Sequence, residues 1–249
     1  MSSELNSTPT IIVDQYLAAS KKSAISQNYK GLAIHALPGL HEFIFSKLEA
    51  SIPPGSQVLE LAAGSGAMSL RLKDNGFNVT ATDYVSGNFR LHESIQFFEA
   101  DLNADFSKER EDSFNAIVAT EIIEHIENPR HFARQCFKLL KKGGNIFFST
   151  PNVDSAASIV SHIRCGTHQW FSDGDYAHDG HITPLMQWQI DKCFKEAGFK
   201  FSYKGSFGDR YERFHGSPRL VLLSKLVNKL SILNDELKGQ IFVAVATKP

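Results

Sequence analysis

The sequence predicts an α/β protein built around a mainly parallel β-sheet with helices on both faces. Two observations lead to this expectation. Between residues 57 and 150, short apolar segments alternate with segments of helical periodicity, which is the pattern of parallel strands joined by crossover helices. Several of these apolar segments run continuously without polar alternation, as expected for strands that are buried on both sides.

Each predicted element has a signal in the sequence. Strands are expected at residues 57–61, 77–82, 95–100, 114–120 and 145–150, and two late strands at residues 199–203 and 240–247. Helices are expected at residues 67–75, 129–142 and 184–198, and Gly76 and Gly143 stand where the first two would end.

We expect an N-terminal helical cap, residues 1–54, followed by one α/β domain, residues 55–249. Apolar residues recur at helical spacing over residues 11–29 and 37–50, which predicts two helices in the cap. Residues 152–183 are rich in Gly, His, Asp and aromatic residues and break the alternation, so we expect an irregular segment that acts as a lid or binding loop. A leucine-rich extra helix is expected at residues 218–233.

The composition excludes several classes of protein. With 249 residues, 42% of them hydrophobic, and a formal net charge of -1, the chain fits a folded domain, and nucleic acid is an unlikely partner. The three cysteines are far apart and form no CxxC pair, which rules out a zinc ribbon and suits a reducing compartment. The chain begins without a secretory signal and contains no membrane-spanning apolar run, so we expect a cytoplasmic protein.

A glycine turn follows the first strand of the domain. The sequence VLELAAGSG, residues 58–66, places Gly64 and Gly66 between a strand and a helix, where backbone can approach a ligand and the helix offers free N–H groups. Such a turn also occurs without a ligand, so by itself it leaves the function open.

Acidic residues at four strand ends strengthen the prediction of a ligand site. Glu60, Asp83, Asp101 and Glu121 lie at or just after successive strands, and ligands of open parallel sheets bind beyond those ends. A nicotinamide-dependent oxidoreductase has a similar layout, but Ser69 stands where its fingerprint has a third Gly or Ala. An acid inside the first strand also suits a cationic cofactor better than a pyrophosphate.

Taken together, five segments resemble the class I S-adenosylmethionine-dependent methyltransferases: VLELAAGSG, TATDY, FEADLN, FNAIVATEIIEHIENP and LLKKGGNIFFSTPN. The resemblance implies a Rossmann-like seven-stranded sheet with a C-terminal antiparallel hairpin. It departs from the usual motif at Ala62, which replaces the first glycine.

The resemblance also assigns cofactor-binding roles. It places Glu60, Ala62, Gly64 and Gly66 against the methionine portion of S-adenosylmethionine. It places Asp83 on the ribose, Tyr84 and Leu102 beside the adenine, Asp101 at the adenine amino group, and Thr120 on the methyl-donor side.

A second constellation follows the fourth strand. If residues 121–125 turn helically, Glu121, Glu124 and His125 share one face, and together with the later His181 they could hold a divalent metal. The pattern resembles ubiquinone-biosynthesis O-methyltransferases and small-RNA 2′-hydroxyl methyltransferases, in the second of which these residues hold a metal. Without a metal, the catalytic general base would be His125 or His181, with Glu124 beside them.

The acceptor side has a further resemblance. Residues 161–171, the segment DGHITP and Trp188 resemble methyltransferases of cell-surface polysaccharide and glycolipid biosynthesis. Trp170, Phe171 and Tyr176 either stack on a sugar or aromatic ring, or pack the lid. The 218–233 helix either packs on the sheet or a dimer partner, or touches a lipid-linked acceptor or an anionic membrane surface.

The sequence therefore predicts an S-adenosylmethionine-dependent methyltransferase that O-methylates a small-molecule, saccharide or glycolipid acceptor. The alternatives are a metal-assisted RNA 2′-O-methyltransferase, a nicotinamide-dependent oxidoreductase and a noncatalytic module that keeps the cofactor fold. The acceptor itself, a homodimer and peripheral membrane contact all stay open.

Overall fold

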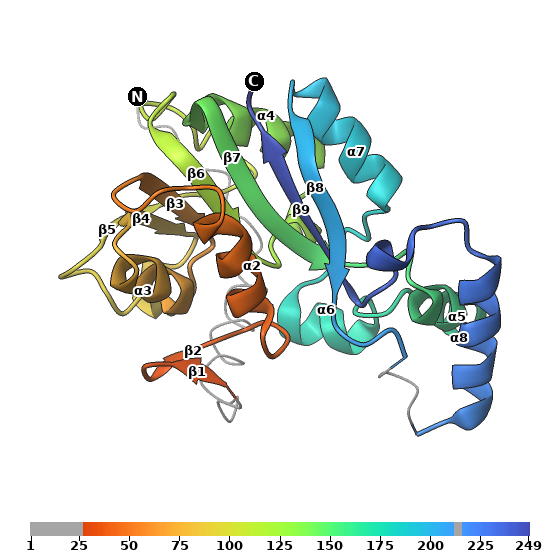
Figure 1. Ribbon diagram of the computed structural model, residues 1–249. Coiled ribbons are helices and arrows are strands. Elements are labelled where there is room, and N and C mark those ends of the chain that lie inside the picture. Colours follow the sequence, from red (N-terminus) through yellow and green to blue (C-terminus); the bar gives the residue numbers. More distant parts are fainter. Residues whose placement is uncertain (1–26, 212–215) are drawn as a thin grey trace, which may run out of the picture.

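The computed structural model describes residues 27–211 and 216–249. A seven-stranded sheet runs through the middle, in the order β5-β4-β3-β6-β7-β9-β8 (Figure 1). Its strands are β3 (Gln57–Leu61), β4 (Asn78–Asp83), β5 (Gln96–Glu99), β6 (Phe114–Ala119), β7 (Leu140–Pro151), β8 (Lys200–Phe207) and β9 (Ile241–Thr247). The first five are parallel, and β9 pairs antiparallel with both β7 and β8. The predicted sheet and its late antiparallel pair are confirmed.

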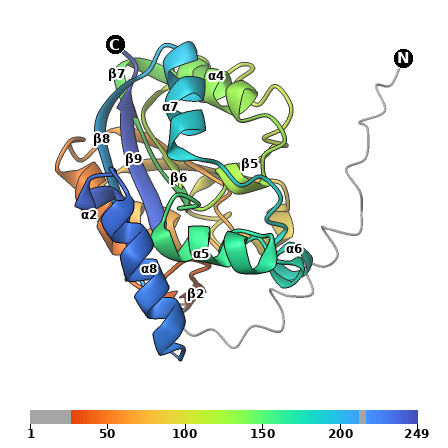
Figure 2. The ribbon, with the colours of Figure 1, turned by 90° about the vertical axis from the view of Figure 1, so that its right-hand side faces the viewer.

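Helices cover both faces of the sheet, as Figures 1 and 2 show. On one face lie α2 (Leu40–Glu49) and α3 (Ala67–Asp74), and on the other α4 (Pro129–Leu139) and α7 (Gln187–Glu196). Alternating strand residues supply the two cores: Val58 packs with α2 and α3, and Leu59 packs with α4 and α7. Both faces of the central strands β3 and β6 are therefore buried, which explains the continuous apolar runs in the sequence.

The predicted N-terminal cap is only partly described. Most of the helix expected at residues 11–29 lies outside the described residues. Its last two positions form β1 (Asn28–Tyr29), which pairs with β2 (Leu32–Ala33) around a turn in which Lys30 and Gly31 both have positive φ. A helix cannot pass through that turn, so the prediction is wrong at Asn28–Tyr29. The second predicted helix is α2, and it packs directly on the sheet.

Residues 152–183 were predicted to be irregular, and this prediction is wrong. They contain α5 (Ala156–Cys165) and α6 (Asp173–Asp179). The side chains of Ser155 and Ser172 cap the two helix starts, and left-handed Gly166 and Gly180 end them. These capping signals are present in the sequence and identify both helices.

The last helix, α8 (Pro218–Leu230), packs against α5 and lies outside the sheet layers (Figure 2). Short 3₁₀ turns complete the chain: η1 (Ser86–Asn88), η2 (Ile123–His125) and η4 (Asp235–Leu237). Over the described ranges, no helix has the length and apolar character that crossing a membrane requires.

Candidate active site

The glycine turn joins β3 to α3 at the carboxyl edge of the sheet. Ala62, Gly64 and Gly66 have φ values of 55°, 52° and 93°, so the chain turns sharply and enters α3 at Gly66. A Cβ on Gly66 would come within 2.9 Å of the Phe89 ring, so only glycine fits there. Ala62 shows that a left-handed position can hold a side chain as small as a methyl group, at some cost in backbone strain.

Asp83 ties this turn to the end of β4. One carboxylate oxygen accepts a hydrogen bond from the Gly64 amide at 2.8 Å, and the other accepts one from the Val85 amide at 3.0 Å. Burial raises the pKa of Asp83, while the two backbone donors act in the opposite direction. The acid predicted from its spacing thus lies in direct contact with the predicted glycine turn.

The next strand continues the same edge. The Ala100 amide donates to the Asp83 carbonyl at 3.0 Å, which sets Asp101 one residue further along. A carboxylate oxygen of Asp101 accepts from the Asn103 amide at 2.8 Å. Leu102 is buried, whereas Tyr84 is exposed beside the turn. We call this row of strand ends, residues 60–66, 83–84, 101–102 and 120, the cofactor edge.

Glu60 is a buried member of the cofactor edge. Its carboxylate accepts a hydrogen bond from the Ser69 hydroxyl on α3, and burial, with a smaller contribution from Asp83, raises its pKa to about 8. A buried carboxyl of this kind is stabilised in its ionised form by a nearby cation. The amino group of S-adenosylmethionine would supply that cation.

Two hydroxyls at or near the cofactor edge also bear on whether a polar cofactor suits the residues there. The side-chain oxygens of Thr82 and Thr120 are buried and have no hydrogen-bond partner among the described residues. Buried polar atoms without partners are rare in folded proteins and often face a ligand or water. The residues present therefore fit a polar cofactor at this edge.

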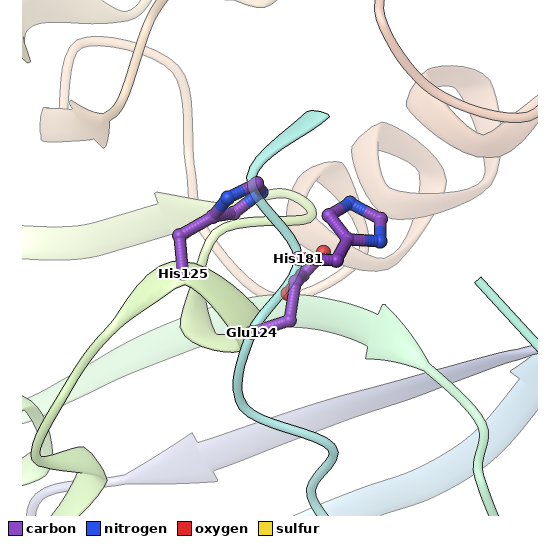
Figure 3. A group of neighbouring side chains, drawn as sticks. All are labelled: Glu124, His125 and His181. Atoms are coloured by element: carbon purple, nitrogen blue, oxygen red, sulfur yellow. The ribbon is translucent and has the colours of Figure 1, made fainter. Parts of the chain in front are cut away.

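The second constellation lies further along the carboxyl edge, after β6. Among the described residues, Glu124, His125 and His181 form a cluster whose ligand atoms all lie within 4.8 Å of one another (Figure 3). The rings of His125 and His181 are 4.8 Å apart between centroids and are nearly perpendicular. Two imidazoles and one carboxylate form a ligand set that suits zinc, manganese or iron(II).

Hydrogen bonds hold the distant His181 against η2. The Thr183 amide donates to the Glu124 carbonyl at 2.9 Å, and the Thr183 hydroxyl donates to the Ile126 carbonyl at 2.9 Å. The Nδ1 atom of His181 lies 2.7 Å from the Trp170 carbonyl. Because a carbonyl only accepts, Nδ1 carries the proton in the neutral ring, and Nε2 keeps a free lone pair.

Glu124 is the buried member of the cluster, and His125 and His181 are half-buried. Glu124 is buried, and one of its carboxylate oxygens accepts from the Thr150 hydroxyl at 2.9 Å, while the other has no partner among the described residues. Burial, and then the Glu121 carboxyl, raise the pKa of Glu124 well above its ordinary value. Burial, and then His181, lower the pKa of His125 to about 3, so this imidazole is neutral at physiological pH. A neutral imidazole is the form that binds metal.

Glu121 lies outside the cluster, although it was predicted as a metal ligand. Residue 121 has a φ of 50°, so the helical turn that would align it with Glu124 does not form there, and η2 begins only at Ile123. A carboxylate oxygen of Glu121 accepts from the Ser149 hydroxyl at 2.7 Å. Burial raises the pKa of Glu121 to about 7.

The lid aromatics lie on the same side as the cluster. The Phe171 ring is 5.7 Å from the His181 ring, and Tyr176 on α6 is exposed. Trp170 has a positive φ of 69°, and its indole N–H is buried without a partner among the described residues. We call the cluster and residues 167–183 the acceptor side.

Sequence reasoning missed the hydroxyls that hold these carboxyls. Ser69, Ser149 and Thr150 each bond to one of the glutamates described above. A polar residue within an apolar helix face or strand end is the signal that identifies them.

Comparison with known proteins fits this geometry. A family profile described as a methyltransferase domain matches residues 34–202. The chain belongs to this methyltransferase family.

The Ubiquinone biosynthesis O-methyltransferase of Xanthomonas axonopodis pv. citri (strain 306) is 34% identical over 138 residues, which are 52% of this chain and 56% of that protein. The protein of the same name from Xanthomonas campestris pv. campestris (strain B100) is 34% identical over 117 residues, 44% of this chain and 49% of its own. The chain thus spans about half the length of the curated relatives it matches.

Solved structures share the fold. A SAM dependent methyltransferase from Archaeoglobus fulgidus superposes with a TM-score of 0.56 at 17% identity, covering 84% of this chain and 94% of its own. The cyclase SpnF superposes with a TM-score of 0.59 at 13% identity, covering 96% and 93%. Because one of these neighbours is named as a cyclase, the fold alone leaves the reaction open, and the site has to decide it.

Proposed function

We propose that this protein transfers a methyl group from S-adenosylmethionine to a hydroxyl of a small-molecule, saccharide or glycolipid acceptor. The family supports methyl transfer and disfavours the oxidoreductase alternative. The names of the curated relatives support oxygen as the acceptor atom. The cofactor edge would hold the donor, with Asp83 on the ribose diol, Asp101 at the adenine amino group and Glu60 near the methionine amino group.

The observation that carries the proposal is the cluster of Glu124, His125 and His181 beside the cofactor edge. In the reaction, the acceptor oxygen attacks the methyl carbon in line with the breaking carbon–sulfur bond, and S-adenosylhomocysteine leaves. The hydroxyl must lose its proton to a base or to solvent during this step. We expect the cluster to supply that base or to hold a metal, and the lid to orient the acceptor and exclude water.

Glu124, His125 and His181 would hold a divalent metal, if one is used. Such a metal supplies Lewis-acid chemistry that lowers the pKa of the bound hydroxyl. The unpartnered, buried oxygen of Glu124 supports this, because a cation would compensate the buried charge. Without a metal, the free Nε2 of His181 is the better base, since burial makes His125 a weak one.

The acceptor-binding residues are assigned to the lid, residues 152–183. Trp170, Phe171 and Tyr176 would stack on a sugar or aromatic ring at this side. We also propose that the protein acts in a reducing, cytoplasmic setting, which three free cysteines support. A second candidate, methylation of an RNA 2′-hydroxyl, is favoured by the same cluster but disfavoured by the net charge of -1.

The test combines cofactor binding, metal binding and turnover. Isothermal titration should show that S-adenosylmethionine binds, and labelled cofactor should transfer methyl to one member of a panel of catechols, sugars, glycolipids and short RNAs. Glu124→Gln should lose roughly 100-fold in turnover and in affinity for manganese, while cofactor affinity stays unchanged. The matched control is Glu127→Gln, an exposed neighbour that should behave like the unaltered protein.

A different result would contradict each part of the proposal. Binding of NADH in place of S-adenosylmethionine would contradict methyl transfer. Full turnover in excess chelator, with no manganese bound, would remove the metal and leave His181 as base. Transfer only to RNA would replace the small-molecule acceptor with the second candidate.

A further inference from the structure

The outer face of α8 is apolar and has no covering element among the described residues. Its inner face, through Leu220, Val221 and Val227, packs on Ala157 and Val160 of α5. Its outer face presents Leu222, Leu226 and Leu230, each four residues from the next and 71%, 54% and 75% exposed. Leu223 and Ile232 are also exposed, and so is Ile163 on α5. Large exposed apolar patches of this kind mark interaction sites.

This helix lies outside the part of the chain that the family profile matches. The family match ends at residue 202, whereas α8 begins at Pro218. Figure 1 shows α8 beside α5, away from the sheet. The exposed leucines therefore lie on a helix that packs on α5.

The charges on the same helix indicate what covers it. Arg219, Lys225 and Lys229 are exposed among the leucines. Residues 216–233 contain no Asp or Glu. Two copies of α8 packed face to face would bring like charges together, which disfavours a second copy as the partner. An anionic lipid surface instead complements these cations and accepts the leucines between its headgroups.

We propose that the outer face of α8, residues 219–232, docks onto the surface of an anionic lipid bilayer. The leucines insert at the boundary between headgroups and acyl chains. The Lys and Arg stems lie along the apolar surface while their charged groups reach lipid phosphates. α5 connects this face to the acceptor side, so docking favours a membrane-resident acceptor. That consequence rests on the proposed function, whereas the docking itself does not.

The experiment is sedimentation of the full chain with vesicles of phosphatidylcholine alone or mixed equally with phosphatidylglycerol. We expect binding to the mixed vesicles, weakened at high salt, and little binding to phosphatidylcholine alone. Leu222→Asp with Leu226→Asp should weaken binding at least about tenfold, because apolar insertion is lost. Lys225→Glu with Lys229→Glu should have a similar effect and remove most of the salt dependence.

Matched controls test whether vesicle binding depends on this face of α8, and not on the total charge or on any exposed apolar side chain. Lys138→Glu with Lys142→Glu makes the same charge change at exposed positions on α4 and β7. Trp188→Asp removes an exposed aromatic on α7. Both controls should bind vesicles like the unaltered chain, and circular dichroism should show that all variants fold.

Three outcomes would overturn the proposal. One is equal binding to both kinds of vesicle. Another is binding that the α8 variants leave unchanged. The third is a dimer in analytical ultracentrifugation that Leu222→Asp with Leu226→Asp separates, with no vesicle binding, since a second copy would then cover the face. Because binding is measured without turnover, these results are independent of the methyltransferase assays.

Discussion

The cofactor edge takes its side chains from strand ends that follow one another along β3, β4 and β5, whereas the acceptor side joins residues far apart in the chain. Asp83 reaches Gly64 across two paired strands, 19 positions away. Thr183 reaches Ile126 across 57 positions and several loops and helices. The cofactor edge is therefore built into the sheet, while the acceptor side depends on how α5, α6 and their loops pack.

This difference has a physical consequence. Parallel pairing fixes where each strand ends, so the acids at those ends meet whenever the sheet forms. The loop that carries His181 must instead be ordered by its own few hydrogen bonds against the entropy of a long connection. Changes at the cofactor edge should therefore alter donor binding, and changes at the acceptor side should alter turnover alone.

The largest expected effect separates the two regions directly. Asp83→Ala removes the acceptor of two backbone hydrogen bonds and the proposed ribose contact, so S-adenosylmethionine should bind roughly 100-fold more weakly. Isothermal titration measures this effect. The control is Asp112→Ala, an exposed acid paired with Lys248. A change of less than about threefold at Asp83 would show that the cofactor edge does not hold the donor.

A smaller effect concerns pH. Burial raises the pKa of Glu60 to about 8, so in the free protein this carboxyl is protonated at neutral pH. A cationic amino group beside it favours the ionised form, so donor affinity should rise with pH toward 8, by at most about tenfold per pH unit. Titration calorimetry over this range checks the slope.

Two variants test whether Glu60 causes this rise of donor affinity with pH. Glu60→Gln should remove it, because the amide does not titrate, and Glu49→Gln, at an exposed position on α2, should keep it. An unchanged slope in Glu60→Gln would assign the proton to another group.

The smallest effect should appear on the acceptor side alone. Thr183→Val keeps the side-chain shape but removes the bond to the Ile126 carbonyl, which is worth about 1 kcal/mol, or roughly a fivefold loss of turnover if the His181 loop loosens. Donor affinity should stay the same. Thr247→Val is the matched control, since that hydroxyl donates to Asn145 far from the site. Weaker donor binding in Thr183→Val would contradict the separation of the two regions.

Much of the fold follows from local patterns. The strands and α3, α4 and α7 lie within a few residues of their predicted positions, because apolar periodicity acts locally. The predicted stop of α4 at Gly143 is wrong, since that helix ends at Leu139 and Gly143 lies within β7. The turn at Lys30 and Gly31 and the helices α5 and α6 were missed. In those helices the capping residues Ser155 and Ser172 outweigh a composition that favours loops.

The site divides in the same way. The glycine turn and the acids after the strands are set by the sequence, since a strand that ends at Asp83 or a turn that needs Gly66 is a local requirement. The resemblance already grouped His181 with Glu124 and His125, and the tertiary structure brings these three together. The tertiary structure alone decided that Glu121 turns toward Ser149 and that burial leaves His125 neutral. It also decided that one face of α8 packs on α5 while its leucines and lysines stay exposed. These outcomes depend on which surfaces meet and which exclude water, and a pattern of residues along a chain does not contain that information.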